Sequence, residues 1–123
     1  MQYRRNEGFR FQFEKPVKGL FSIIRRNGKQ VQSRSGSVTV IDISPNGLRL
    51  QSPLELPIET NQKIEISVSF TINSTKLSYK GTILWKRPVQ ESFQYGILLE
   101  NEEDERQEII DEIKLYQKRL KKE

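Results

Sequence analysis

Two groups of polar residues in this sequence have the chemistry to recognise an anionic, hydrogen-bonding ligand. The first is the segment 42–47, in which Asp42 and Ser44 come directly before a Pro-Asn-Gly turn. Ile41 and Ile43 have core-type side chains, so Asp42 and Ser44 should share the opposite face of a strand. That face would accept hydrogen bonds from a flat polar ligand. The second group would supply donors and positive charge, and it consists of Arg4, Arg5 and Arg10.

The composition of the chain excludes several classes of enzyme. The 123 residues fit one domain, and they include neither Cys nor His. Thiolate nucleophiles, imidazole bases, the usual zinc ligands and disulfides are therefore ruled out. The pattern shows no other acid–base or metal constellation, so we expect neither an enzyme nor a bound cofactor. The polar start and the lack of a long apolar run favour a cytoplasmic protein without membrane insertion.

Positive charge is concentrated near the N-terminus. Residues 1–30 contain eight Lys or Arg and two Glu, a net charge of +6, whereas the other 13 basic and 14 acidic residues sum to −1. We therefore expect attraction to anions in this region, rather than a uniformly basic nucleic-acid-binding surface.

The second half of the strand region alternates strictly between apolar and polar residues. The runs 63–73, 77–85 and 93–99 each place apolar side chains at every second position, which is typical of antiparallel strands with one buried face. Tyr79 and Trp85 fall on the apolar phase and are expected in the core. Pro88 is expected in a loop before the last strand. Closing such a sheet removes its exposed edges, so the pattern favours a small β-barrel.

The first half of the chain reads as shorter strands. We expect strands over 20–26, 30–34 and 38–44, with a hairpin turn at Asn27-Gly28. The apolar residues of the third segment change phase after Val40, which predicts a β-bulge there. A further short strand is expected at 48–50, and Pro53 and Pro57 then end the regular pattern.

The C-terminal segment is expected to form an amphipathic helix. Asn101 can cap it, acidic residues fill its first turn and basic residues its last, which complements the helix dipole. One apolar stripe consists of Ile109, Ile113, Tyr116 and Leu120. The sequence thus divides into a basic arm at 1–14, a β-barrel at 15–100 and the helix at 101–123.

These features together resemble the PilZ domain, the bacterial receptor module for cyclic di-GMP. The family motif Asp/Asn-x-Ser-x-x-Gly is matched at its three fixed positions by Asp42, Ser44 and Gly47. The family also has an N-terminal pair of arginines, usually with three residues between them. Here Arg5 and Arg10 have four residues between them and Arg4 and Arg10 have five, so this part of the pattern is matched only loosely.

The resemblance implies a mainly β fold, a six-stranded antiparallel barrel with a C-terminal α-helix. It also implies that cyclic di-GMP is bound by Arg4, Arg5, Arg10, Asp42, Ser44 and Gly47. Arginines suit phosphates and the O6 and N7 acceptors of guanine, while a carboxylate can accept from guanine N–H groups. The function expected is a cytoplasmic receptor that couples this second messenger to a partner protein, with folding of the arm onto the barrel as the switch.

Two alternatives stay open from the sequence. One is a PilZ-like adaptor that no longer binds nucleotide and acts through protein–protein interaction, which the unusual arginine spacing favours. The other is a barrel that binds single-stranded nucleic acid through the basic arm and aromatic residues. The near-neutral charge outside the arm makes nucleic acid the weaker of the two.

Overall fold

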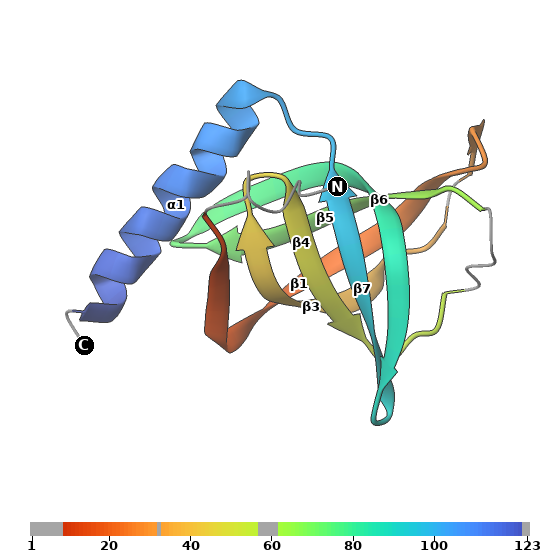
Figure 1. Cartoon of the computed structure of the whole chain (residues 1–123), viewed down its shortest axis with the longest axis horizontal. Coiled ribbons are helices and arrows are strands. Elements are labelled where there is room, and N and C mark those ends of the chain that lie inside the picture. Colours follow the sequence, from red (N-terminus) through yellow and green to blue (C-terminus); the bar gives the residue numbers. More distant parts are fainter. Residues whose placement is uncertain (1–8, 32, 57–61, 122–123) are drawn as a thin grey trace.

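The computed structural model describes residues 9–31, 33–56 and 62–121, which form a closed antiparallel β-barrel with one helix along its side (Figure 1). The elements are β1 (Phe11–Arg26), β2 (Lys29–Gln30), β3 (Gly36–Ser44), β4 (Gly47–Ser52), β5 (Ile64–Ile72), β6 (Thr75–Val89), β7 (Ser92–Leu99) and α1 (Glu103–Lys121).

The strands are ordered β2-β1-β3-β4-β7-β6-β5, and an additional pairing of β1 with β5 closes the barrel. The short β2 extends only the tip of β1, so six strands form the wall, as the sequence predicts. Closure leaves the barrel wall without a free edge, which satisfies the backbone groups of the central strands. Among the described residues, no helix is long and apolar enough to cross a membrane.

Strand β1 is longer than the sequence indicates, because it runs from Phe11 through Pro16 to Arg26. Its pairing with β3 shifts register between Gln12 and Val17, so Pro16 lies in an irregular stretch that needs no ladder donor. Residues 11–14, which are expected from the sequence to belong to the basic arm, are part of this strand. The expected return strand at 30–34 is reduced to Lys29–Gln30.

Alternation in β5 is confirmed and supplies much of the core. Its apolar positions are all buried, and they are Ile64, Ile66, Val68, Phe70 and Ile72. Each such side chain stabilises the fold by about 1.5–3 kcal/mol relative to an exposed position. The matching positions Leu77 and Tyr79 of β6 are also buried.

The prediction that Trp85 belongs to the core is wrong, because 40% of its surface is exposed. The pairing of β6 with β7 shifts register between Ile83 and Trp85, and this irregularity moves the later residues of β6 to the opposite phase. Pro88 also differs from the expectation, since it lies within β6 opposite Phe93. Beyond Thr82, β6 no longer pairs with β5 but stays paired with β7, which itself pairs with β4 as far as Phe93.

Helix α1 begins one residue later than the sequence suggests. The Glu102 backbone N–H donates to Glu105 Oε1 at 2.9 Å, and the Glu102 carbonyl accepts from the Arg106 N–H, so Glu102 is the cap rather than Asn101. The Asn101 side chain instead donates to the Pro45 carbonyl at 3.0 Å. That bond ties the entry to α1 to the turn between β3 and β4.

The helix packs on the barrel through the expected stripe. Ile109 and Ile113 are fully buried, Tyr116 is partly buried, and Leu120 is exposed. Tyr79 donates to Glu108 Oε1 at 2.6 Å, and burial, together with this bond, raises the pKa of the phenol far above its usual range. Tyr116 also makes edge-on ring contacts with Phe11 and Phe13 at centroid distances of 5.8 and 5.5 Å. The start of β1 and the helix are therefore one packed unit.

We expect Ile113→Ala to lower the free energy of unfolding by about 3 kcal/mol, because it leaves a cavity between α1 and the barrel. Leu115→Ala removes a side chain of similar size from the same helix, but 46% of Leu115 is exposed, so its effect should stay within about 0.5 kcal/mol. Urea unfolding followed by circular dichroism measures both. Equal effects of the two substitutions would contradict the packing described.

Candidate functional site

The β-bulge in β3 decides which residues reach the outer face of the barrel. Register between β3 and β4 shifts between Val40 and Asp42, as predicted. Val38, Val40 and Ile43 are buried in the core, whereas Ile41 is only partly buried. In a regular strand Asp42 would follow Val40 onto the inner face, because side chains alternate. The bulge instead places Asp42 and Ser44 on the outer side of the strand, where neighbouring residues cover both side chains.

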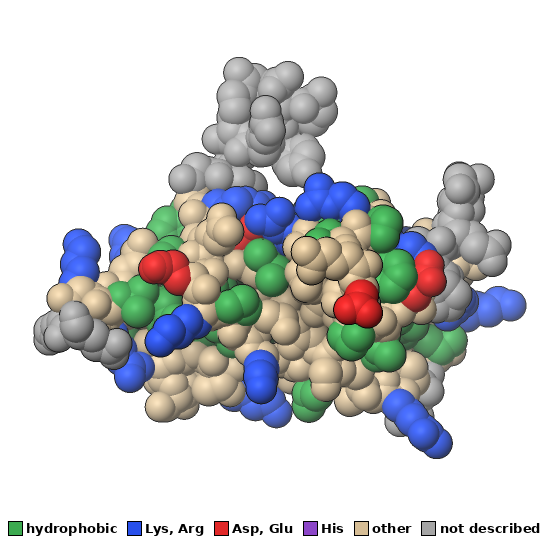
Figure 2. Space-filling view, turned by 90° about the horizontal axis from the view of Figure 1, so that it is seen from below, with side chains coloured by type: hydrophobic (Ala, Val, Ile, Leu, Met, Phe, Trp, Pro, Cys, Tyr) green, Lys and Arg blue, Asp and Glu red, His purple; other side chains and the backbone are tan. Residues whose placement is uncertain are grey.

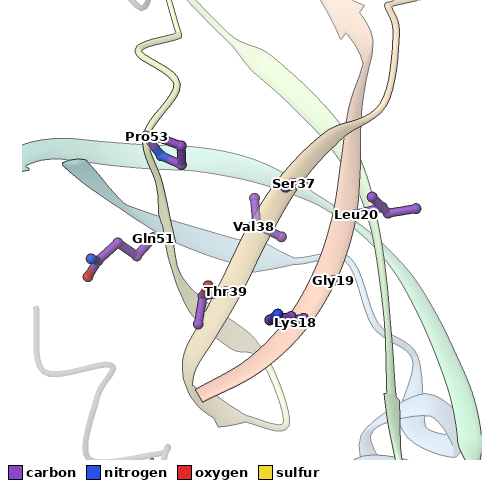
Figure 3. A pocket seen from close by; sticks show the side chains of 8 residues that line it. All are labelled: Lys18, Gly19, Leu20, Ser37, Val38, Thr39, Gln51 and Pro53. Carbon is purple, nitrogen blue, oxygen red and sulfur yellow. The ribbon is translucent and has the colours of Figure 1, made fainter. Parts of the chain in front are cut away.

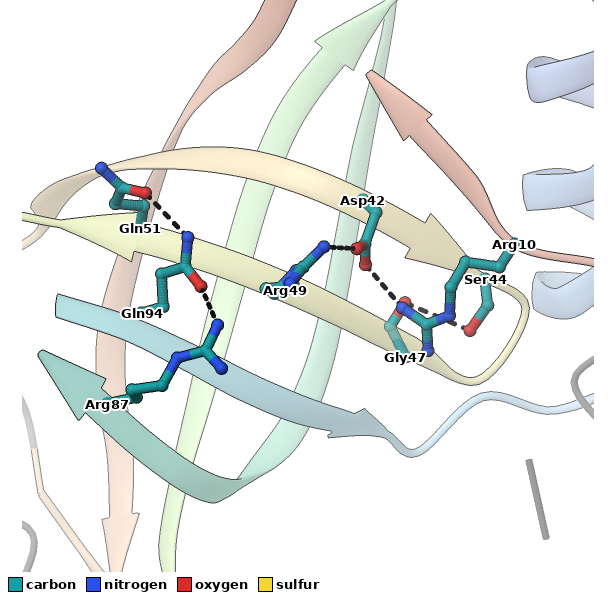
Figure 4. A network of polar contacts seen from close by, with 8 residues as sticks. All are labelled: Arg10, Asp42, Ser44, Gly47, Arg49, Gln51, Arg87 and Gln94. Atoms are coloured by element: carbon teal, nitrogen blue, oxygen red, sulfur yellow. Dashed lines mark hydrogen bonds and ion pairs between the residues drawn. The ribbon is translucent and has the colours of Figure 1, made fainter. Parts of the chain in front are cut away.

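Asp42 lies between two arginines. Its Oδ1 accepts from Arg10 Nη1 at 2.5 Å, and its Oδ2 is 2.6 Å from Arg49 Nη2 (Figure 4). Only 4% of the Asp42 side chain is exposed, against 49% for Arg10 and 30% for Arg49. The carboxylate is thus covered by its partners, while both arginine side chains stay partly exposed and keep unused donors, one of which, Arg49 Nε, is buried without a partner. The arrangement presents two oriented cations on one surface.

The tight turn at Pro45-Asn46 holds this arrangement in place. Ser44 pairs directly with Gly47, and the Ser44 hydroxyl donates to the Gly47 carbonyl at 3.5 Å. A Cβ at Gly47 would lie 3.3 Å from Ser44 Oγ and 3.8 Å from Arg10 Nη2. Gly47 therefore allows the chain to approach both side chains closely. Ser44 itself is fully buried, and its visible role is to shape the turn.

Strand register extends this surface across β7 and β6. Asp42 is opposite Arg49, Arg49 is opposite Gly96, and Gly96 is opposite Trp85. The indole of Trp85 lies directly over Gly96, because a Cβ on Gly96 would come within 2.1 Å of the indole nitrogen. Trp85 therefore rests on the strand beside Arg49 with part of its ring open to solvent.

A second row of polar residues runs parallel to the first. Thr39 is opposite Gln51, Gln51 is opposite Gln94, and Gln94 is opposite Arg87. Arg87 Nη2 donates to Gln94 Oε1 at 2.8 Å, and Gln94 Nε2 donates to Gln51 Oε1 at 3.0 Å, as Figure 4 shows. The guanidinium of Arg87 is also 5.5 Å from the centroid of the Trp85 ring. This chain of bonds positions Arg87 against Trp85.

We call the surface formed by these two rows the arginine face, and its residues are Arg10, Asp42, Arg49, Gln51, Trp85, Arg87 and Gln94. Figure 2 shows Lys and Arg side chains gathered at the upper edge of the molecule in that view, with hydrophobic side chains among them. Three guanidinium groups and one exposed indole suit a ligand with phosphates and a flat aromatic ring. Within the described residues, no group of carboxylates, Cys or His could hold a metal ion.

The structure brings together Arg10, Asp42 and Gly47 of the expected site residues and places Ser44 beneath them. Arg4 and Arg5 lie outside the described residues. Arg49, Trp85 and Arg87, which the structure adds to the candidate site, are not among the site residues expected from the sequence. Arg49 can be predicted from the sequence, because a two-residue turn at 45–46 pairs position 42 with position 49. The other two depend on the register shift in β6, which the sequence pattern does not reveal.

Comparison with known proteins agrees with the fold and the motif. The family model described as PilZ domain matches residues 4–115. A solved structure, the PilZ domain of CeSA from a cellulose-synthesising bacterium, is similar with a TM-score of 0.56 at 13% sequence identity. The alignment covers 88% of this chain and 98% of that one. No curated protein matches the chain.

The family match spans most of the sequence, from the N-terminal arginines to the middle of α1. The barrel, its closure by β1 and β5 and the motif at Asp42, Ser44 and Gly47 are all present in the structure. The chain therefore belongs to the PilZ domain family.

Proposed function

We propose that this protein is a receptor for cyclic di-GMP and that the nucleotide binds on the arginine face. The observation that carries the proposal is the buried carboxylate of Asp42 held between Arg10 and Arg49, which fixes two guanidinium groups on the outer surface. Cyclic di-GMP carries two phosphates and two guanines, and a forked guanidinium can bind either group. Family membership supports this ligand over other anions.

Asp42 acts in this account mainly by positioning its two partners. Both carboxylate oxygens already accept from arginine, and the side chain is almost entirely covered. The resemblance implies that Asp42 accepts directly from guanine, but its contacts support a role in holding Arg10 and Arg49 instead. Fixed arginines lose less side-chain entropy on binding, so the ligand gains affinity from their prior ordering.

Trp85 and Arg87 complete the proposed site. A guanine ring can stack on the exposed part of the Trp85 indole, and Arg87 lies close enough to cover the purine or to contact a phosphate. The roles of Arg4 and Arg5 stay predictions. One of them would supply the second arginine of the arm, with Gly8 accommodating the longer spacing to Arg10.

Binding at Arg10 has a direct route to α1. Phe11 follows Arg10 in the chain and contacts the Tyr116 ring, so movement of the arm toward a ligand acts on the helix packing. We propose that the helix and the arm together form the surface that a partner protein senses. The partner, and the cytoplasmic location expected from the sequence, stay predictions.

We expect saturable binding of cyclic di-GMP in isothermal titration calorimetry. Arg10→Ala should weaken it about 10- to 100-fold, because a charge-assisted hydrogen bond to the ligand is lost. Arg34→Ala is the matched control, since Arg34 is an exposed arginine away from the arginine face, and it should leave affinity unchanged. Equal affinities for the two variants would contradict the site. No binding by the unaltered chain would favour the nucleotide-independent adaptor.

The single tryptophan of the chain provides an independent measurement, because Trp85 lies on the arginine face. We expect cyclic di-GMP to quench or shift its fluorescence along the same saturation curve that calorimetry gives. Gly96→Ala should displace the indole and weaken binding, since the added Cβ would overlap the ring. A ligand that binds in calorimetry without changing the fluorescence would place the site away from Trp85.

A further inference from the structure

The end of the barrel away from α1 carries a concentration of positive charge. The β1–β2 hairpin lies at this end, far from the helix (Figure 1), and basic residues surround it: Arg25, Arg26, Lys29, Arg34 and Lys63. Lys63 is fixed beside the hairpin, because its backbone N–H donates to Asn27 Oδ1 at 2.9 Å and its carbonyl accepts from the Asn27 N–H at 2.8 Å. Among the described residues, only Arg25 has an ion-pair partner here, Glu65 at 3.3 Å.

Exposed aliphatic side chains accompany these cations. Leu20 is 51% exposed and Leu54 is 48% exposed, and Val31 on the hairpin is also exposed. Leu20 pairs with Ser37, and the adjacent Gly36 faces Leu54, whose Cδ1 would be 2.9 Å from a Cβ at that glycine. The two leucines therefore border the same end of β3.

A groove of about 440 Å³ opens between these elements (Figure 3). Its lining combines the apolar side chains of Leu20 and Pro53 with polar residues, which are Ser37, Thr39 and Gln51, and with the cation Lys18. Lys18 has no ion-pair partner among the described residues. A groove with apolar side chains and one exposed lysine can contact a molecule that is apolar in its body and anionic at its head.

We propose that this end of the barrel, which we call the basic end, binds the surface of an anionic phospholipid bilayer. The hairpin cations would contact the headgroup phosphates, and Leu20, Val31 and Leu54 would enter the boundary between headgroups and acyl chains. Both signals are needed, since exposed apolar residues or surface cations alone hold a protein at a membrane weakly. The acidic first half of α1 is at the other end of the molecule, so it does not oppose this orientation.

Nucleic acid fits the same surface less well. Binding to single strands depends on aromatic side chains that stack on bases, and the large exposed side chains of the basic end are aliphatic. The only exposed aromatic among the large hydrophobic residues described is Trp85, which belongs to the arginine face. The hairpin cations are not part of the arginine face, although Gln51 borders both that face and the groove. The proposal rests on the cations and exposed leucines and does not depend on nucleotide binding.

The test is co-sedimentation of the full chain with vesicles of phosphatidylglycerol and phosphatidylethanolamine, compared with vesicles of phosphatidylcholine alone. We expect binding to the anionic vesicles that weakens as salt is raised. Lys29→Glu with Arg34→Glu should reduce the affinity about 30-fold or more. Lys76→Glu with Lys114→Glu makes the same change in net charge away from the basic end and should have little effect. Leu20→Ser with Leu54→Ser should weaken binding although every cation is kept.

Three results would overturn the proposal. The first is no sedimentation with anionic vesicles at low salt. The second is an equal loss of binding in the Lys29/Arg34 and Lys76/Lys114 double variants, which would show that binding depends on net charge and not on the basic end. The third is tighter binding of a DNA or RNA oligonucleotide at the same salt, lost in the hairpin variants, which would assign the basic end to nucleic acid. Circular dichroism establishes that each variant is folded.

Discussion

The arginine face depends on one interaction, the carboxylate of Asp42 held between the guanidinium groups of Arg10 and Arg49. The three residues come from different segments: Arg10 precedes β1, Asp42 is in β3 and Arg49 is in β4. The interaction therefore requires the β3 bulge, the two-residue turn and the pairing of β1 with β3. Because both arginines reach water, the desolvation that makes buried ion pairs unfavourable is concentrated on one carboxylate. The arrangement fixes geometry more than it stabilises the fold.

The packing around this interaction connects the arginine face to α1. Arg10 leads directly into the aromatic contacts of Phe11 and Phe13 with Tyr116. On the other side, the turn at Pro45 is bonded to Asn101 at the entry to α1. Contacts at Tyr116 and at the entry to α1 thus join the helix to the segments that present Arg10 and Asp42. Two sets of contacts thus join the arginine face to α1.

Sequence patterns predict the parts of this structure that follow simple periodicity. The alternation in β5 and β7, the bulge after Val40 and the apolar stripe of α1 as far as Tyr116 all appear as expected. The pattern fails where a local irregularity changes the phase, as at Trp85, which the register shift in β6 moves to the surface. It also fails in β1, because Pro16 and the surrounding charges conceal a strand that continues through an irregular stretch.

The residues of the candidate site also differ in how well the sequence predicts them. The motif at Asp42, Ser44 and Gly47 can be recognised in the sequence because its residues are close together in the chain. The position of Arg49 follows from the length of the turn. Trp85 and Arg87 come from strands far along the chain, and their place beside Arg49 depends on register through β7. Two glycines, Gly47 and Gly96, make room for the neighbouring side chains, which only the three-dimensional contacts reveal.

The most direct test of the account is to map the amide chemical shifts of the labelled protein by NMR as cyclic di-GMP is added. The account predicts the largest changes at residues 42–49 and at Gly96, with smaller changes reaching Tyr116 through the aromatic contacts. Shifts confined to the basic end, or no shifts at saturating ligand, would contradict the assignment of the arginine face as the nucleotide site.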